Sequence, residues 1–155
     1  SQLFTAAIYL PASKKVFWVN QDGKSCVNES VFIPNEVSDI DNAVLLIEKG
    51  KTKKAVSQFK AFLSHSEKFR TIRCFGAVCA DVSSMLSKTA TAHVVFDADL
   101  HDLAPAACLY QHAGFSVVNA KGKDWKISDR DLLATDPKNL KDLVEIATQI
   151  REHLT

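Results

Sequence analysis

Three aspartates lie close together in the middle of the chain. Asp97 and Asp99 follow an apolar, strand-like run from His93 to Phe96, and Asp102 stands where a helical pattern begins. Side chains at the carboxyl end of a strand and at the start of the next helix face the crevice where α/β proteins collect ligands. The turn therefore offers oxygen ligands for a hard cation. The alternative is that Asp102 caps the helix and the other two acids are only solvated.

A histidine directly precedes the third of these acids. The neighbouring pair His101 and Asp102 suggests acid/base chemistry, although adjacent residues at a helix start generally point apart. We therefore place His101, with Asp97 and Asp99, among possible additional site residues. Neither a serine nor a cysteine has the sequence setting of a nucleophile elbow, which argues against covalent catalysis.

Three segments of the chain carry a resemblance to a known family. His101 to Ala106 (HDLAPA), followed by His112 to Phe115 (HAGF), is similar to the Trp-Asp-x-Ala-Ala-Gly…Glu-Ala-Gly-Gly signature of the inositol monophosphatase family. Arg73 to Asp81 (RCFGAVCAD) resembles its Arg-x-x-Gly-Ser-Ala-Ala-x-Asp/Asn segment. Leu132 to Pro137 (LLATDP) resembles the strand before its last helix. The order and spacing of these segments agree over nearly the whole chain.

The resemblance has three departures and implies a set of site residues. The family's tryptophan, glutamate and second glycine are replaced by His101, His112 and Phe115. The resemblance implies that Asp102 is a ligand of a catalytic Mg²⁺ ion. It also implies that the substrate is bound around Gly76, Ala77 and Asp81.

The resemblance covers only part of what the family's chemistry needs. Family members carry an N-terminal Gly-Glu-x-Ser-like element and an Asp-Pro-Ile/Leu-Asp-Gly-Thr motif, whose carboxylates supply most of the metal site, and this sequence has neither. We expect the C-terminal lobe of a Mg²⁺-dependent phosphomonoesterase, acting on an inositol phosphate, a sugar phosphate or a nucleotide 3′-phosphate and inactive alone. The alternative is a non-catalytic binding or regulatory module that retains the fold.

The expected partners follow from that reading. They are the missing N-terminal lobe or a partner chain, a second copy of this chain, and a phosphorylated small molecule. We also expect the sequence to be a piece of a longer protein, because it opens inside an apolar run.

Composition excludes several other classes of protein. The 155 residues carry 19 Lys and Arg against 18 Asp and Glu, so the net charge of +1 gives no field that favours nucleic acid or membranes. The four cysteines lack the spacing of a zinc site, which favours free thiols and a cytoplasmic location. No apolar run is long enough to span a bilayer.

The hydrophobic pattern predicts one α/β domain over residues 1–155, with a mixed sheet of about five or six strands and helices on both faces. An antiparallel hairpin opens it, with Phe17 and Trp18 in the core, and a short third strand is expected at residues 25–27. Further strands are expected at 43–47, 69–73, 93–96, 115–118 and 132–134. The helix after the acidic turn should start near Asp102, so that Pro105 lies in its first turn. Asp136 should cap the last helix.

Overall fold

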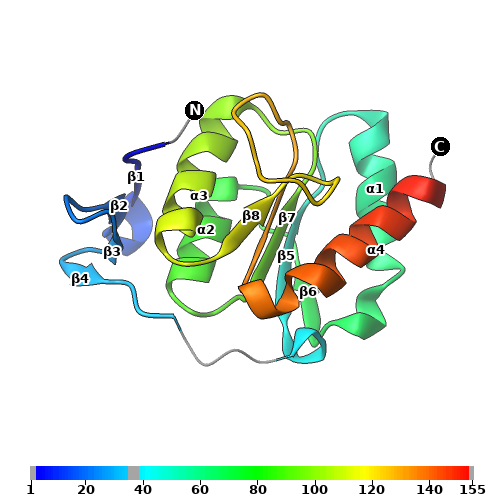
Figure 1. Ribbon diagram of the computed structural model, residues 1–155, viewed down its shortest axis with the longest axis horizontal. Coiled ribbons are helices and arrows are strands. Elements are labelled where there is room, and N and C mark those ends of the chain that lie inside the picture. The colour runs from blue at the N-terminus through cyan, green and yellow to red at the C-terminus, as the bar shows by residue number, and fades with distance from the viewer. Residues whose placement is uncertain (1–2, 35–38, 154–155) are drawn as a thin grey trace.

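The computed structural model describes residues 3–34 and 39–153, which fold into four layers (Figure 1). The first layer is a four-stranded sheet, the second is the pair of helices α2 and α3, and the third is a five-stranded sheet. Helices α1 and α4 cover the far face of that second sheet. The predicted α/β class is confirmed, with the mixed sheet covered by helices on both faces.

The two sheets have different topologies. The first is antiparallel in the order β1-β2-β3-β4, and consists of β1 (Ala7–Leu10), β2 (Lys15–Val19), β3 (Ser25–Val27) and β4 (Ser30–Val31). The second has the order β6-β5-β7-β9-β8, and consists of β5 (Val44–Glu48), β6 (Thr71–Arg73), β7 (Ala92–Val95), β8 (Ser116–Val118) and β9 (Leu132–Thr135). Strand β5 runs parallel to β6 and β7, whereas β9 is antiparallel to β7 and β8. The opening hairpin is therefore part of a sheet of its own.

Four α-helices lie in the described residues. They are α1 (Lys53–Leu63), α2 (Val78–Leu86), α3 (Leu100–His112) and α4 (Leu140–His153). Thr52 caps α1 by accepting the amide of Ala55. The predicted cap at Asp136 is confirmed, because its carboxylate accepts the amide of Lys138 in a short 3₁₀ turn before α4. In the part of the chain that the structure describes, no helix is both long and apolar enough to cross a membrane.

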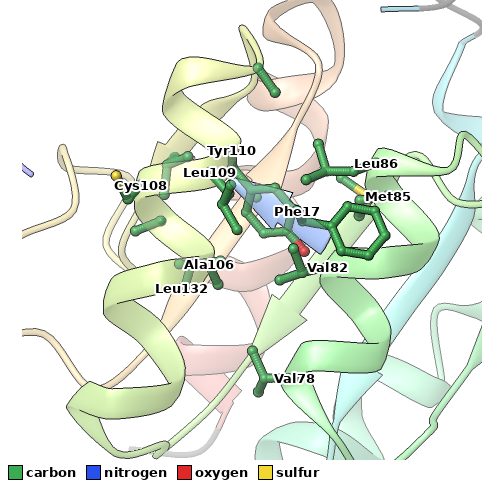
Figure 2. Packing of buried hydrophobic residues seen from close by; sticks show 14 of the residues in the cluster. Phe17, Val78, Val82, Met85, Leu86, Ala106, Cys108, Leu109, Tyr110 and Leu132 are labelled. Carbon is green, nitrogen blue, oxygen red and sulfur yellow. The ribbon is translucent and has the colours of Figure 1, made fainter. Parts of the chain in front are cut away.

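Two hydrophobic cores lie on opposite faces of the mixed sheet. In β5, Leu46 faces the core around α2 and α3, while its neighbours Leu45 and Ile47 face the core beneath α1 and α4, as the two-residue period of a strand requires. Figure 2 shows Phe17 of β2 among side chains of α2 and α3, so the first core also joins the two sheets. Trp18 differs from the prediction: it is 37% exposed on the outer face, and its indole N–H donates to the carbonyl of Asn28.

Helix α3 begins earlier than its proline suggests. Its first residue is Leu100 and Asp99 occupies the N-cap position, so the predicted start near Asp102 is wrong by two residues and Pro105 lies inside the helix. A proline there removes one helical hydrogen bond, at a typical cost of about 3 kcal/mol. Complete burial of Leu103 and Ala106 on either side of it offsets this cost, because the helix packs between two sheets.

A glycine after β5 is required by space as well as by conformation. Gly50 has φ +70°, and a Cβ atom there would lie 2.5 Å from both the Ala55 Cβ and the carbonyl oxygen of Phe96. Gly114 also has positive φ, at +90°, but a Cβ there would meet nothing within 4 Å. A side chain at Gly114 would therefore meet only the strain of a left-handed backbone, whereas a side chain at Gly50 would meet both this strain and steric overlap.

We predict that Gly114→Ala lowers the free energy of unfolding by about 1–2 kcal/mol, from backbone strain alone. Gly50→Ala should lower it by about 2–5 kcal/mol, because overpacking adds about 1–3 kcal/mol to the same strain. Urea denaturation of both variants measures the difference. Equal losses would show that the contact with Phe96 relaxes without cost.

Candidate functional site

A pocket of about 570 Å³ opens at the carboxyl ends of the parallel strands β5, β6 and β7. Parallel strands with following helices bring their carboxyl ends to one edge of the sheet, where ligands usually bind. The pocket is lined by the ends of β5 and β7, by the turns after β5, β6 and β7, and by the first residues of α2 and α3. Among its lining residues are four of the predicted site residues, Gly76, Ala77, Asp97 and Asp102.

Asp102 presents a carboxylate to this pocket from the first turn of α3. Its side chain is 36% exposed, and Nε2 of His101 lies 3.7 Å from its Oδ2. It is not the helix cap, since its own amide donates to the carbonyl oxygen of Asp99. Among the described residues, His101 is the only basic side chain within ion-pair distance of Asp102. The carboxylate is therefore open to a cation from the pocket.

The other two aspartates of the turn are paired with cations of the protein. Arg130, from the connection between β8 and β9, donates to Asp97 at 3.0 Å and to Asp99 at 3.1 Å. Lys51 lies 3.2 Å from Asp99. The bond from Arg130 holds the pKa of Asp97 below its usual range, and Lys51, followed by Arg130, does the same for Asp99. Of these two carboxylates only Asp97 lines the pocket, and both are already paired with cations of the protein.

The three aspartates do not converge on one point. Across residues 3–34 and 39–153, no group of three or more His, Cys, Asp or Glu side chains is arranged to hold a metal ion. His101 is largely exposed, at 79% of its side chain. The acidic turn therefore contributes one open carboxylate to the pocket rather than a complete set of ligands.

The start of α2 supplies the pocket's N–H groups. Ala77 is the N-cap residue and has no side-chain cap. The amides of Val78 and Cys79 open the helix and have no helical acceptor, as is general for a first turn. The amide of Gly76, expected to face substrate, instead donates to Oε1 of Glu48 at 3.0 Å. Anion recognition at this edge would therefore depend on the amides after Gly76.

Asp81 lies beneath the pocket and has no exposed surface. Its Oδ2 is 3.3 Å from Nε2 of His93, which is also fully buried. Burial is the first cause that raises the pKa of Asp81, to about 6. The same effect lowers the pKa of His93 to about 3, because burial disfavours the charged form of each group. Asp81 therefore supports the pocket from below and has no exposed surface that could contact a ligand.

Sequence reasoning missed Glu48, which lines the pocket at the end of β5. Burial raises the pKa of Glu48 from 4.5 to about 7. Asp81 raises this pKa further, through a side-chain hydrogen bond and through charge repulsion. The signal that could have found it is an acidic residue directly after an unbroken apolar run, where a buried parallel strand ends. The predicted strand stopped one residue short, at Ile47.

The family follows from a comparison over nearly the full length of the chain. A sequence model of the inositol monophosphatase family matches residues 2–154. The chain belongs to this family. The resemblance seen in its aspartate and glycine segments is thereby confirmed. A search of curated proteins found no match.

Solved inositol monophosphatases share the fold. The IMPase of Thermotoga maritima matches 99% of this chain with a TM-score of 0.86 at 13% identity, and the inositol monophosphatase from Anabaena matches 93% with a TM-score of 0.82 at 16% identity. An IMPase/NADP phosphatase solved with NADP and Ca²⁺ matches 92% with a TM-score of 0.77 at 12% identity. This chain spans 59%, 60% and 54% of the lengths of those three chains.

The partly buried Glu48 and the fully buried His93 predict a pH-dependent stability. The pKa of Glu48 rises from 4.5 to about 7 on folding, so the folded state binds its proton more tightly. That contribution to stability is complete below pH 4.5 and is lost as the pH rises through 7. His93 acts in the opposite direction, since its pKa falls from 6.5 to about 3 and its contribution is lost as the pH falls below 6.5.

We therefore predict that Glu48→Gln gains stability relative to the unsubstituted chain as the pH rises from 5 to 8, because glutamine cannot lose a proton. Urea denaturation at pH 5, 6, 7 and 8 gives the difference at each pH. The matched control is Glu67→Gln, at an exposed position, for which the difference should not vary. A pH-independent difference for Glu48→Gln would contradict the raised pKa.

Proposed function

We propose that this chain is the C-terminal lobe of a Mg²⁺-dependent phosphomonoesterase and that Asp102 is a ligand of its metal. The observation that carries the proposal is the open carboxylate of Asp102, which faces a pocket that also contains the first-turn amides of α2. A carboxylate for a cation and N–H groups for an anion are the two elements that a metal-bridged phosphate needs.

The donor chemistry of Asp102 fits Mg²⁺, which prefers carboxylate oxygen and retains several water ligands. When bound, the ion would neutralise phosphate charge and activate water. Asp97 and Asp99 are unsuited to this role because Arg130 and Lys51 already neutralise them. The remaining carboxylates would come from outside this chain, which supports the proposal that the chain alone is inactive.

The substrate class in this proposal is a phosphorylated small molecule: an inositol phosphate, a sugar phosphate or a nucleotide 3′-phosphate. Lys49 lines the pocket that also contains the first-turn amides of α2 and favours an anion, whereas Lys51 is paired with Asp99. A related structure is described as inositol monophosphate-bound and another as a complex with NADP, which supports a phosphate ester as the ligand. A cytoplasmic location is part of the proposal because all four cysteines are free thiols.

The outer face of the first sheet carries exposed apolar side chains. Tyr9 is 58% exposed, Trp18 37% and Val31 43%. Their registers place them on one face, since Trp18 pairs with Ala7 on one side and with Cys26 on the other, and Cys26 pairs with Val31. We propose that an N-terminal lobe or a partner chain covers this apolar face, because the chain spans only 59% of the Thermotoga maritima chain.

We predict that Asp102→Asn lowers the Mg²⁺-dependent phosphatase activity of the full natural protein on the order of 100-fold or more, since loss of a metal ligand should exceed the effect of outer-shell changes. Asp99→Asn, a matched change at the neighbouring aspartate that is paired with Lys51 and Arg130, should stay within about fivefold of the unsubstituted protein, because exposed ion pairs contribute little. Assays with inositol monophosphate and varied Mg²⁺ separate metal affinity from turnover. Full activity of Asp102→Asn would contradict its role as a metal ligand, and absence of Mg²⁺-dependent activity from the unsubstituted protein would favour the non-catalytic binding module instead.

We also predict that the 155-residue chain alone associates through the exposed face of its first sheet. Tyr9→Lys should reduce this association by placing a charge on the face, whereas Ile127→Lys, at an exposed apolar position elsewhere, should not. Sedimentation velocity at several concentrations measures it. A chain that is monomeric at all concentrations, with or without Tyr9→Lys, would contradict the proposed docking face.

A further inference from the structure

One arginine forms hydrogen bonds with three consecutive residues of the acidic turn. Nε of Arg130 donates to Oδ1 of Asp97 at 3.0 Å, and its Nη2 donates to Oδ1 of Asp99 at 3.1 Å. The carbonyl oxygen of Arg130 accepts the amide of Ala98 at 2.9 Å. A guanidinium holds its N–H groups in a fixed plane, so two contacts from one fork define an orientation as well as a charge. Arg130 therefore joins the connection between β8 and β9 to the turn through both its side chain and its main chain.

The backbone of the turn has a conformation that requires support from its surroundings. Asp97 has φ +50°, in the left-handed region that residues other than glycine seldom adopt. Strained backbone of this kind persists where the surrounding structure fixes it. The bonds from Arg130 to Asp97 and to Ala98 lie at this point of the chain. They therefore hold the strained residue and the residue after it.

The carboxylate of Asp99 is held away from the helix that it precedes. Asp99 is the N-cap residue of α3, where an aspartate usually accepts an amide of the first turn, but its side chain makes no such bond. Its two oxygens instead accept from Arg130 at 3.1 Å and from Lys51 at 3.2 Å. The two cations therefore determine where this carboxylate lies.

The residues that Arg130 holds lead directly into the first turn of α3. The amide of Asp102 donates to the carbonyl oxygen of Asp99, so the position of Asp102 depends on the turn before it. Asp97 and Asp102 both line the pocket, but only Asp97 is paired with an arginine. The guanidinium therefore distinguishes the two carboxylates that a cation in the pocket could reach.

We propose that Arg130 is a positioning residue for the metal site, because it holds residues 97–99 so that Asp102 alone of the three aspartates is presented to a cation. This inference rests on the proposed function of Asp102 as a metal ligand. Its own content is the choice among three nearby carboxylates, two of which Arg130 neutralises and orients. Arg130 is not among the residues that line the pocket, so it acts through the turn.

Binding of Mn²⁺ to the 155-residue chain tests this choice without any activity. Mn²⁺ shares the preference of Mg²⁺ for oxygen ligands, and it broadens the NMR signals of nearby nuclei. In the unsubstituted chain we expect the carboxyl signal of Asp102 to broaden first. In Arg130→Gln, which keeps the main-chain carbonyl, broadening should extend to Asp97 and Asp99. The Mn²⁺ affinity of the turn should rise about fivefold, because each released ion pair is worth little.

Two further variants separate the position of Arg130 from its charge. Arg70→Gln removes the same charge at an exposed position before β6, at the end of that strand away from the pocket, and should leave the broadening pattern unchanged. Arg130→Lys keeps the charge but loses the planar fork, so it should restore the pattern only in part. A pattern for Arg130→Gln equal to that of Arg70→Gln would overturn the proposal, as would full restoration by Arg130→Lys.

A measurement on the unsubstituted chain applies even if a variant does not fold. A guanidinium held by two carboxylates exchanges its Nε–H slowly with water, so at neutral pH the Nε–H signal of Arg130 should persist after that of Arg70 is lost. Equally fast exchange at both arginines would overturn the proposal.

Failure of the proposed function gives a different result. If Mn²⁺ leaves the signal of Asp102 sharp in the unsubstituted chain, the role of Asp102 as a metal ligand is contradicted. The comparison of Arg130→Gln with Arg70→Gln still decides whether Arg130 keeps a cation from Asp97 and Asp99, because it is read from the signals of those two residues.

Discussion

The packing of α3 between two sheets is the constraint on which the rest of the structure depends. Ala107, Cys108, Leu109 and Tyr110 are all buried, and four consecutive residues of an α-helix point to all of its sides. A helix buried on most sides has little water to satisfy its polar groups, so these must find protein partners. Ser25 of β3 accordingly donates to the carbonyl of Leu109, and Tyr110 reaches His93 of β7. Each bond attaches α3 to one of the two sheets.

The same constraint gives roles to two of the residues that depart from the family pattern. Nδ1 of His112 lies 2.8 Å from the carbonyl of Gly23 and its Nε2 lies 3.3 Å from that of Leu3, so the end of α3 holds the N-terminal segment. The ring of Phe115 contacts those of Tyr110 and Phe32, with 5.8 Å between centroids in each pair. Both residues lie in the packing between the layers, away from the residues that line the pocket. His101, by contrast, is exposed beside Asp102 at the pocket.

The carboxyl groups in and beside the pocket differ in charge and in pairing. Arg130 and Lys51 neutralise Asp97 and Asp99 through ion pairs, whereas burial favours the protonated, neutral form of Glu48. Asp102 is in neither situation: its side chain is 36% exposed, and no lysine or arginine of the described residues lies within ion-pair distance. The differences arise from distance to a cation and access to water, since all four groups are carboxylic acids. Elements that lie far apart in the sequence supply the cations and the burial.

The amino-acid sequence by itself determined the local elements. Alternating and continuous apolar runs predicted the hairpin, the third strand at residues 25–27 and the buried strands, and Asp136-Pro137 predicted the start of the last helix, because these signals depend on neighbours within a few residues. The family motifs also located the edge of the sheet where Asp102 and Ala77 line the pocket. Only the tertiary structure decided that Pro105 lies inside a helix, that Arg130 pairs with two of the three aspartates, and that Glu48 lines the pocket. Burial and ion pairing depend on segments brought together by packing, which local sequence patterns do not specify.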